Sequence, residues 1–101
     1  MQRALWMVMI ASVLATTGVA AETVSAQRGE ALFNDTRLGT NGKSCSTCHA
    51  KGKGLKEAYE YSDANLAAIV NRCIEKPLAG TPIAPDSPDM KSLLLYLRTF
   101  K

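Results

Sequence analysis

Histidine is nearly absent from this chain: among its 101 residues only His49 is of this type. A zinc ribbon needs two pairs of cysteine or histidine ligands, and beyond Cys45, Cys48 and His49 only Cys73 remains. Histidine is also the most frequent general acid or base in enzymes. The sequence therefore disfavours a zinc ribbon and contains no cluster of substrate-activating acids and bases.

Several other signals are missing. No segment alternates apolar and polar residues as a half-buried strand does, so the sequence predicts an all-α protein. A thioredoxin-type dithiol at Cys45 and Cys48 would need flanking strand–helix–strand segments, which are absent. The formal net charge is only +3, and nothing in its distribution is typical of nucleic-acid binding.

Long apolar runs are absent except at the N-terminus. Arg3 precedes an almost wholly apolar run from Ala4 to Ala15, and small residues follow it. This pattern predicts a secretory signal peptide over residues 1–20, cleaved after Ala20. The run is short for a membrane span of about 20 residues, and an uncleaved anchor facing the periplasm is the alternative. The remaining domain comprises residues 21–101.

The segment Cys45-Ser46-Thr47-Cys48-His49 has the pattern C-x-x-C-H, which is the attachment sequence of a c-type haem. Two thiols with this spacing can add to the two vinyl groups of one haem. The next residue, His49, can then bind the iron as the proximal ligand. The motif predicts one covalent haem c held by Cys45 and Cys48.

Serine caps mark three expected helices, one over Ser25–Asn34, one from Ser62 to Ile74, and one opened by Ser87 with Pro88 at its first position. Asp35 to Ser44 reads as a turn, and the glycine-rich segment 50–54 is expected to have no regular structure.

Apolar residues recur at helical spacing in the second and third of these helices. In the middle helix they form one stripe: Leu66, Ile69, Val70 and Cys73. In the last helix the inward-facing residues are Met90, Leu93, Leu94, Leu97 and Phe100. A chain of this size buries a marginal core, and a haem would give the stripes a large apolar surface to pack on.

A helix, the C-x-x-C-H motif, a middle helix and an aromatic-bearing terminal helix together resemble class I cytochrome c. The resemblance implies a small all-α fold with three main helices around one covalently bound haem. It also implies an exported, periplasmic protein, because haem attachment occurs outside the bacterial cytoplasm. In that family the first and last helices cross where a glycine of one receives an aromatic residue of the other; Gly29 and Tyr96 match these positions.

The sequence departs from that family after the motif. Many class I members place a proline soon after the haem histidine, and its carbonyl accepts the imidazole N–H. Here no proline follows His49 until Pro77, so the sequence does not identify the partner of the His49 ring.

The distal iron ligand has two sulfur candidates. The segment Ile69–Ile74, followed by Gly80 and Asp86–Met90, is similar to thiosulfate dehydrogenase and sulfur-oxidation cytochrome domains, whose cysteine in this segment is an axial haem ligand. The resemblance makes Cys73 the first choice. Met90 is the alternative ligand, and its other interpretation is a residue of the core. The third possibility is that the distal position is open. A thioether raises the reduction potential, whereas a thiolate lowers it by stabilising ferric iron.

Other residues are expected to contact the haem or its partners. Tyr59 and Tyr61 could touch the haem ring or hydrogen-bond a propionate, with ordinary packing as the alternative. Four lysines flank the motif in sequence and could steer an acidic redox partner, or could simply be solvated: Lys43, Lys51, Lys53 and Lys56.

These observations favour a periplasmic monohaem electron-transfer protein without enzymatic activity. The alternative is a haem–thiolate cytochrome, or a subunit of one, that catalyses redox chemistry on thiosulfate-type sulfur compounds through Cys73. An open distal position would instead suit the binding of a gas.

Overall fold

The computed structural model describes residues 23–101, so the expected signal peptide over residues 1–20 lies outside the described part of the chain. The four α-helices are α1 (Ala26–Phe33), α2 (Cys45–Cys48), α3 (Asp63–Glu75) and α4 (Pro88–Leu97). Two 3-10 helices are η1 (Ala50–Gly52) and η2 (Ala58–Glu60). No strand occurs between residues 23 and 101, which confirms the all-α prediction for this region.

The three longest helices begin where the sequence predicts. The hydroxyls of Ser25, Ser62 and Ser87 accept hydrogen bonds from the backbone N–H three residues later, at 3.0, 3.2 and 3.1 Å. Each serine thereby satisfies one N–H group that has no partner inside its helix. Local capping chemistry therefore fixes the start of α1, α3 and α4.

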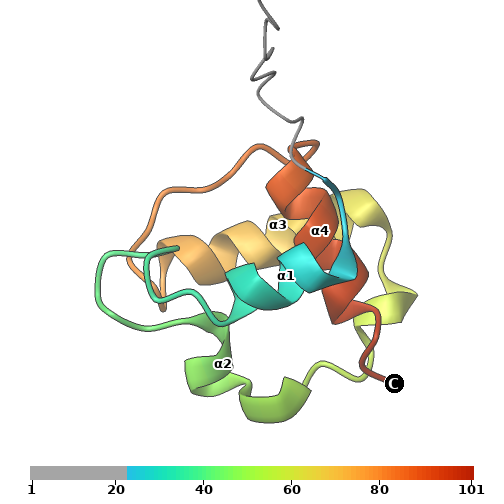
Figure 1. The fold of residues 1–101 in the computed structure, drawn as a ribbon, viewed down its shortest axis with the longest axis horizontal. Helices are drawn as coiled ribbons and strands as arrows, with labels where there is room; N and C mark the ends of the chain where they lie inside the picture. Colours follow the sequence, from blue (N-terminus) through green and yellow to red (C-terminus); the bar gives the residue numbers. More distant parts are fainter. Residues whose placement is uncertain (1–22) are drawn as a thin grey trace, which may run out of the picture.

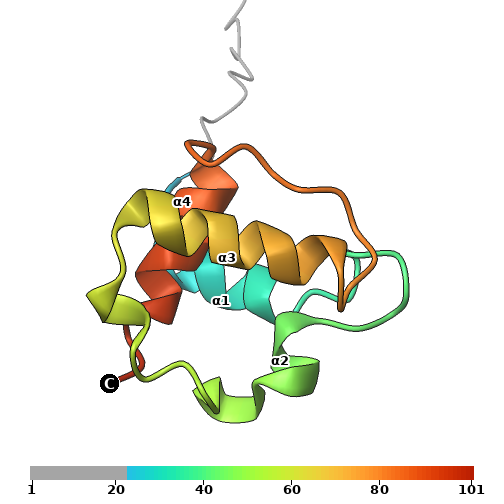
Figure 2. The same ribbon diagram turned by 180° about the vertical axis from the view of Figure 1, so that it is seen from behind.

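The helices are arranged around one crossing. In Figure 1, α1 lies across α4, and the longer α3 passes behind them. Seen from behind, α3 lies in front, and the segment of residues 45–60 forms an arc below it in both views (Figure 2). None of the helices within residues 23–101 has the length and apolar content needed to span a bilayer.

The crossing of α1 and α4 depends on Gly29. A Cβ atom at this position would overlap the backbone carbonyl of Ser92 and would lie 2.7 Å from the Cβ of Tyr96. Two further contacts join the helices: the Ser25 N–H donates to the Ser92 hydroxyl at 3.1 Å, and Arg28 pairs with Asp89 at 3.1 Å. The prediction that the terminal helices pack through Gly29 is confirmed.

We expect Gly29→Ala to lower the free energy of unfolding by about 1–3 kcal/mol, because the added methyl group has to push α4 away from α1. Denaturant unfolding of the purified protein measures this change. Glu30→Ala, at the exposed neighbouring position of the same helix, is the control and should stay within about 0.5 kcal/mol of wild type. Equal stabilities of Gly29→Ala and wild type would contradict a tight crossing.

The segment after the turn is more regular than the sequence indicates. The Ser44 N–H donates to the Thr47 hydroxyl at 2.9 Å and opens the single turn of α2, which the sequence analysis missed. The expectation that residues 50–54 lack regular structure is wrong for Ala50–Gly52, which form η1. Lys51 there has a left-handed backbone, with φ of 53°. Such a conformation in a residue other than glycine leaves little trace in the sequence.

The core lies between α1, α3 and α4. Four of the five residues predicted to face inward from the last helix are buried: Met90, Leu93, Leu94 and Leu97. The fifth, Phe100, follows the end of α4 and is half-buried against the core.

Candidate functional site

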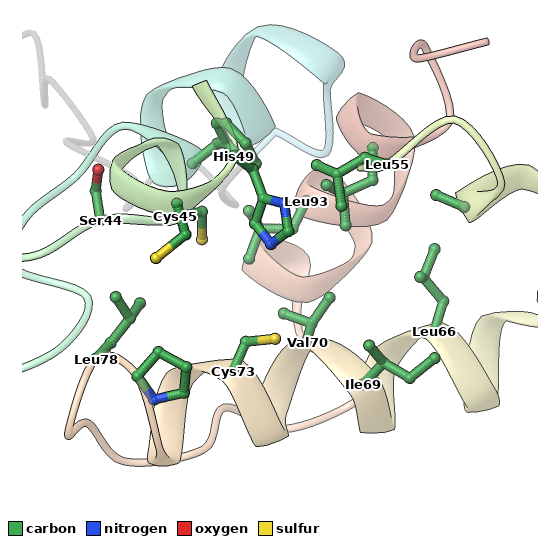
Figure 3. A pocket seen from close by; sticks show the side chains of 15 residues that line it. Ser44, Cys45, His49, Leu55, Leu66, Ile69, Val70, Cys73, Leu78 and Leu93 are labelled. Carbon is green, nitrogen blue, oxygen red and sulfur yellow. The ribbon is translucent and has the colours of Figure 1, made fainter. Parts of the chain in front are cut away.

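An apolar pocket opens between α3 and the arc of residues 45–60, and its empty space of about 680 Å³ includes solvent at its open mouth. Figure 3 shows the side chains that line it. The lining residues are Phe33, Ser44, Cys45, Cys48, His49, Leu55, Ala58, Leu66, Ile69, Val70, Cys73, Pro77, Leu78, Leu93 and Leu97. All fifteen lie within residues 23–101, and none is acidic, lysine or arginine.

The α3 wall is the apolar stripe that the sequence predicts. Leu66, Ile69, Val70 and Cys73 all line the pocket, and their side chains point into it from α3 (Figure 3). Spacing of three and four residues places them on one side of a helix. The thiol of Cys73 is thereby carried into the pocket by the same face that carries the aliphatic side chains.

The C-x-x-C-H motif forms the opposite wall. The turn of α2 carries Cys45, which is half-buried, and Cys48, which is exposed, while His49 follows as its C-cap residue. In Figure 3 the His49 ring points from this wall toward α3. The pocket thus brings the motif and Cys73 together, with His49 and Cys73 on facing walls.

A backbone carbonyl orients the His49 ring. The Nδ1 atom of His49 lies 2.7 Å from the carbonyl oxygen of Lys53. A carbonyl can only accept, so Nδ1 must carry the proton and donate it. In the neutral ring Nε2 then keeps its lone pair, which is the form that binds a metal ion. Lys53 thus fills the role for which the sequence offers no proline.

Burial keeps the two half-buried thiols of the pocket protonated. It raises the pKa of Cys45 from 9.0 to about 11, and the nearby Cys73 contributes to this rise. Burial also raises the pKa of Cys73, partly opposed by the positive charge of Arg72. Both groups are therefore thiols at neutral pH in the chain alone, and the pocket by itself does not activate either as a nucleophile.

The wall beside Cys73 is completed by a segment that is hydrogen-bonded to the turn before the motif. Pro77 and Leu78 reach into the pocket from the segment after α3. The Thr40 N–H donates to the Leu78 carbonyl at 2.9 Å, and the Asn41 side-chain amide donates to the Pro77 carbonyl at 2.7 Å. The sequence analysis did not identify either residue as part of the site. Their signal would have been the apolar pair that follows shortly after the middle helix.

The structure separates the two distal candidates. Met90 lies one turn before Leu93 in α4, is 0% exposed, and is not among the lining residues. Cys73 is half-buried and lines the pocket.

Neither of the two expected tyrosines lines the pocket. Tyr59 is 55% exposed and Tyr61 is 44% exposed, whereas Ala58, the first residue of η2, is buried and lines the pocket. The four lysines flanking the motif are all exposed: Lys43, Lys51, Lys53 and Lys56.

The apolar lining of the pocket suits an apolar group that brings its own metal donors. A metal ion held by protein alone needs three or four ligand side chains in reach. Within residues 23–101 no group of three or more cysteine, histidine, aspartate or glutamate side chains has that arrangement. A porphyrin supplies four nitrogen donors itself and needs only an axial base such as His49 Nε2.

Comparison with known proteins adds no relative. No family model, no curated protein and no solved structure matches this chain. The interpretation of the pocket therefore depends on its own residues.

Proposed function

We propose that this chain is a monohaem c-type cytochrome with the class I fold, and that it carries electrons. Cys45 and Cys48 would hold the haem through thioether bonds, and His49 would be its proximal ligand. The observation that carries the proposal is the 2.7 Å hydrogen bond from His49 Nδ1 to the Lys53 carbonyl. It leaves the metal-binding nitrogen free on a ring that points into an apolar pocket beside both attachment thiols.

The bound haem supplies reversible one-electron chemistry between ferric and ferrous iron. The protein's own residues supply the environment. The aliphatic side chains of α3 and α4 would pack on the bound haem and keep water from it, which would lower the local dielectric around the iron. Apart from His49 and three thiols, the lining holds no acid–base side chain that could act on a substrate, which supports a carrier.

We propose Cys73 as the distal ligand, since it faces His49 from the opposite wall and lines the pocket. Met90 stays the alternative, but its place outside the lining means that α4 would have to move to bring it to the iron. A deprotonated Cys73 would need the iron's positive charge, because burial alone raises its pKa.

The partners would be redox proteins with acidic docking faces. The exposed ammonium groups of Lys43, Lys51, Lys53 and Lys56 surround the motif in sequence and would steer such partners toward it. The proposed location is the periplasm, with residues 1–20 removed or, if they are kept, serving as an anchor.

The test is to produce the full chain in bacteria that express a haem-attachment system for the periplasm. We expect a mass increase of one haem that survives denaturation, and a visible spectrum that changes reversibly in a one-electron redox titration. A known c-type cytochrome made in the same cells is the control. Recovery of this chain without haem, while the control is loaded, would refute the proposal.

A second candidate function follows from Cys73, because a pocket-lining thiol facing the proximal histidine is what haem–thiolate sulfur chemistry would use. In this alternative the protein catalyses redox reactions of thiosulfate-type compounds. Turnover of thiosulfate with an artificial electron acceptor, or of tetrathionate with a reduced dye, would support it, provided that Cys73→Ser abolishes the activity. Haem-loaded protein that shuttles electrons without such turnover would support the carrier.

A further inference from the structure

Three aromatic rings form a cluster at the C-terminal end of the fold. The Phe33 ring of α1 lies edge-on to Tyr96 of α4, with centroids 5.2 Å apart. Phe100, just beyond α4, lies 5.0 Å from Tyr96 and 6.0 Å from Phe33 by the same measure. Such aromatic contacts add to the stabilisation that burial of the rings provides, so the cluster holds Phe100 in a defined place.

The free side of the Phe100 ring contacts η1 at Gly52. A Cβ atom at Gly52 would overlap the Cδ1 atom of this ring and lie 2.5 Å from its Cε1. Gly52 is the only buried residue of the segment 50–54, and the residues around it are exposed. Its φ of 78° is a left-handed conformation that glycine adopts without strain. The segment is therefore attached to the body of the protein chiefly at Gly52.

The same segment carries the carbonyl that orients His49. The Gly52 N–H donates to the His49 carbonyl at 2.9 Å, and the Lys53 N–H donates to the Ala50 carbonyl at 3.1 Å. These two bonds close the turn and aim the Lys53 carbonyl back at His49 Nδ1. A short path of direct contacts thus runs from the Phe100 ring through Gly52 and Lys53 to the imidazole.

We infer that Phe100 is a positioning residue for His49: its ring holds Gly52 in place and so keeps the Lys53 carbonyl on Nδ1. The geometry is independent of any ligand, while the consequence at an iron atom rests on the proposed function. The hydrogen bond to Nδ1 makes the imidazole a stronger donor, which favours ferric over ferrous iron. Loosening of the turn therefore raises the reduction potential of the loaded protein.

The test compares full-length wild type with Phe100→Leu, which keeps apolar bulk but removes the ring. The readout is the exchange of the His49 Nδ1 proton with solvent, followed by nuclear magnetic resonance. The Ile74 amide in the fully buried part of α3 serves as the internal reference for global opening. We expect the ratio of the Nδ1 exchange rate to the Ile74 amide exchange rate to be roughly tenfold higher in Phe100→Leu than in wild type. We also expect the reduction potential of the haem-loaded variant to rise.

Two control variants separate positioning from general destabilisation. Phe100→Tyr keeps the ring and should restore both values to those of wild type. Leu95→Ala removes a side chain that is 45% exposed on α4 and should change neither value. The inference would be overturned if, in Phe100→Leu, the exchange rate of the Nδ1 proton rose only by the same factor as the exchange rate of the Ile74 amide.

Failure of the proposed function is distinguishable from failure of this inference. A wild-type chain without haem would refute the cytochrome, but the exchange comparison on the same full-length chains would still decide the role of Phe100. A wild-type chain in which the Nδ1 proton shows no protection would overturn the inference, whether or not haem is attached.

Discussion

Replacement of both Cys45 and Cys48 by alanine is expected to abolish covalent haem attachment and to leave a chain without a cooperative unfolding transition. The pocket is walled by aliphatic side chains from α3 and α4, and a haem bound there would contact this wall as well as the wall of α2. A chain of this size buries only a marginal core, so a bound group of that size would supply a large part of its stability. Without covalent attachment that contribution is lost.

Mass spectrometry, far-ultraviolet circular dichroism and a thermal melt of the double variant check this expectation. Cys73→Ala is the matched control, because it removes a thiol of the same pocket and neither attachment thiol. This control should keep covalent haem and melt cooperatively. A folded, haem-free double variant with a sharp melt would show that the helices form a sufficient core among themselves.

The helices themselves could be predicted because their signals are local. A serine at each N-terminus and apolar residues at spacings of three and four determine α1, α3 and α4 without reference to the rest of the chain. The contact of Gly29 with α4 came from the family resemblance, and the structure supplies its physical cause. The backbone of Ser92 occupies the space where a side chain would begin.

The partner of His49 could not be predicted, because it is a backbone carbonyl. Every residue carries such a group, so the sequence gives no sign that the carbonyl of Lys53 is the one that turns toward Nδ1. The turn also needs a left-handed Lys51, a conformation for which the residue type gives no indication. Only the completed path from His49 to Phe100 shows why the segment adopts this shape.

The tyrosines illustrate a second limit. Tyr59 and Tyr61 were singled out because aromatic rings often contact haem, but in η2 the residue that turns inward is Ala58. A single turn of 3-10 helix has no periodic pattern long enough to show which residue faces the core. The choice between Cys73 and Met90 had the same difficulty, since both lie on apolar stripes and only the packing of α3 against α4 separates them.

Replacement of Cys73 by serine is expected to change the oxidised spectrum of the loaded protein and to raise its reduction potential. Cys73 lines the pocket on the wall that faces His49, and a thiolate at that position would stabilise ferric iron. Its loss removes that stabilisation. Axial ligation sets haem potentials over about 0.8 V, so we expect an upward shift on the order of 0.1 V. Potentiometric titration and magnetic resonance of the ferric state measure the two effects.

Met90→Leu is the matched variant that decides between the two sulfur ligands. Met90 is 0% exposed and lies outside the pocket lining, so its replacement by a side chain of similar volume should cost less than about 1.5 kcal/mol. Its spectrum and potential should equal those of wild type, because the packing that it changes lies one turn away from Leu93, where α4 reaches the pocket. The reverse result, with an altered spectrum in Met90→Leu and an unaltered one in Cys73→Ser, would assign the iron to Met90. It would also require α4 to shift on haem binding, and Cys73 would then be a core residue on the stripe of Leu66 and Val70.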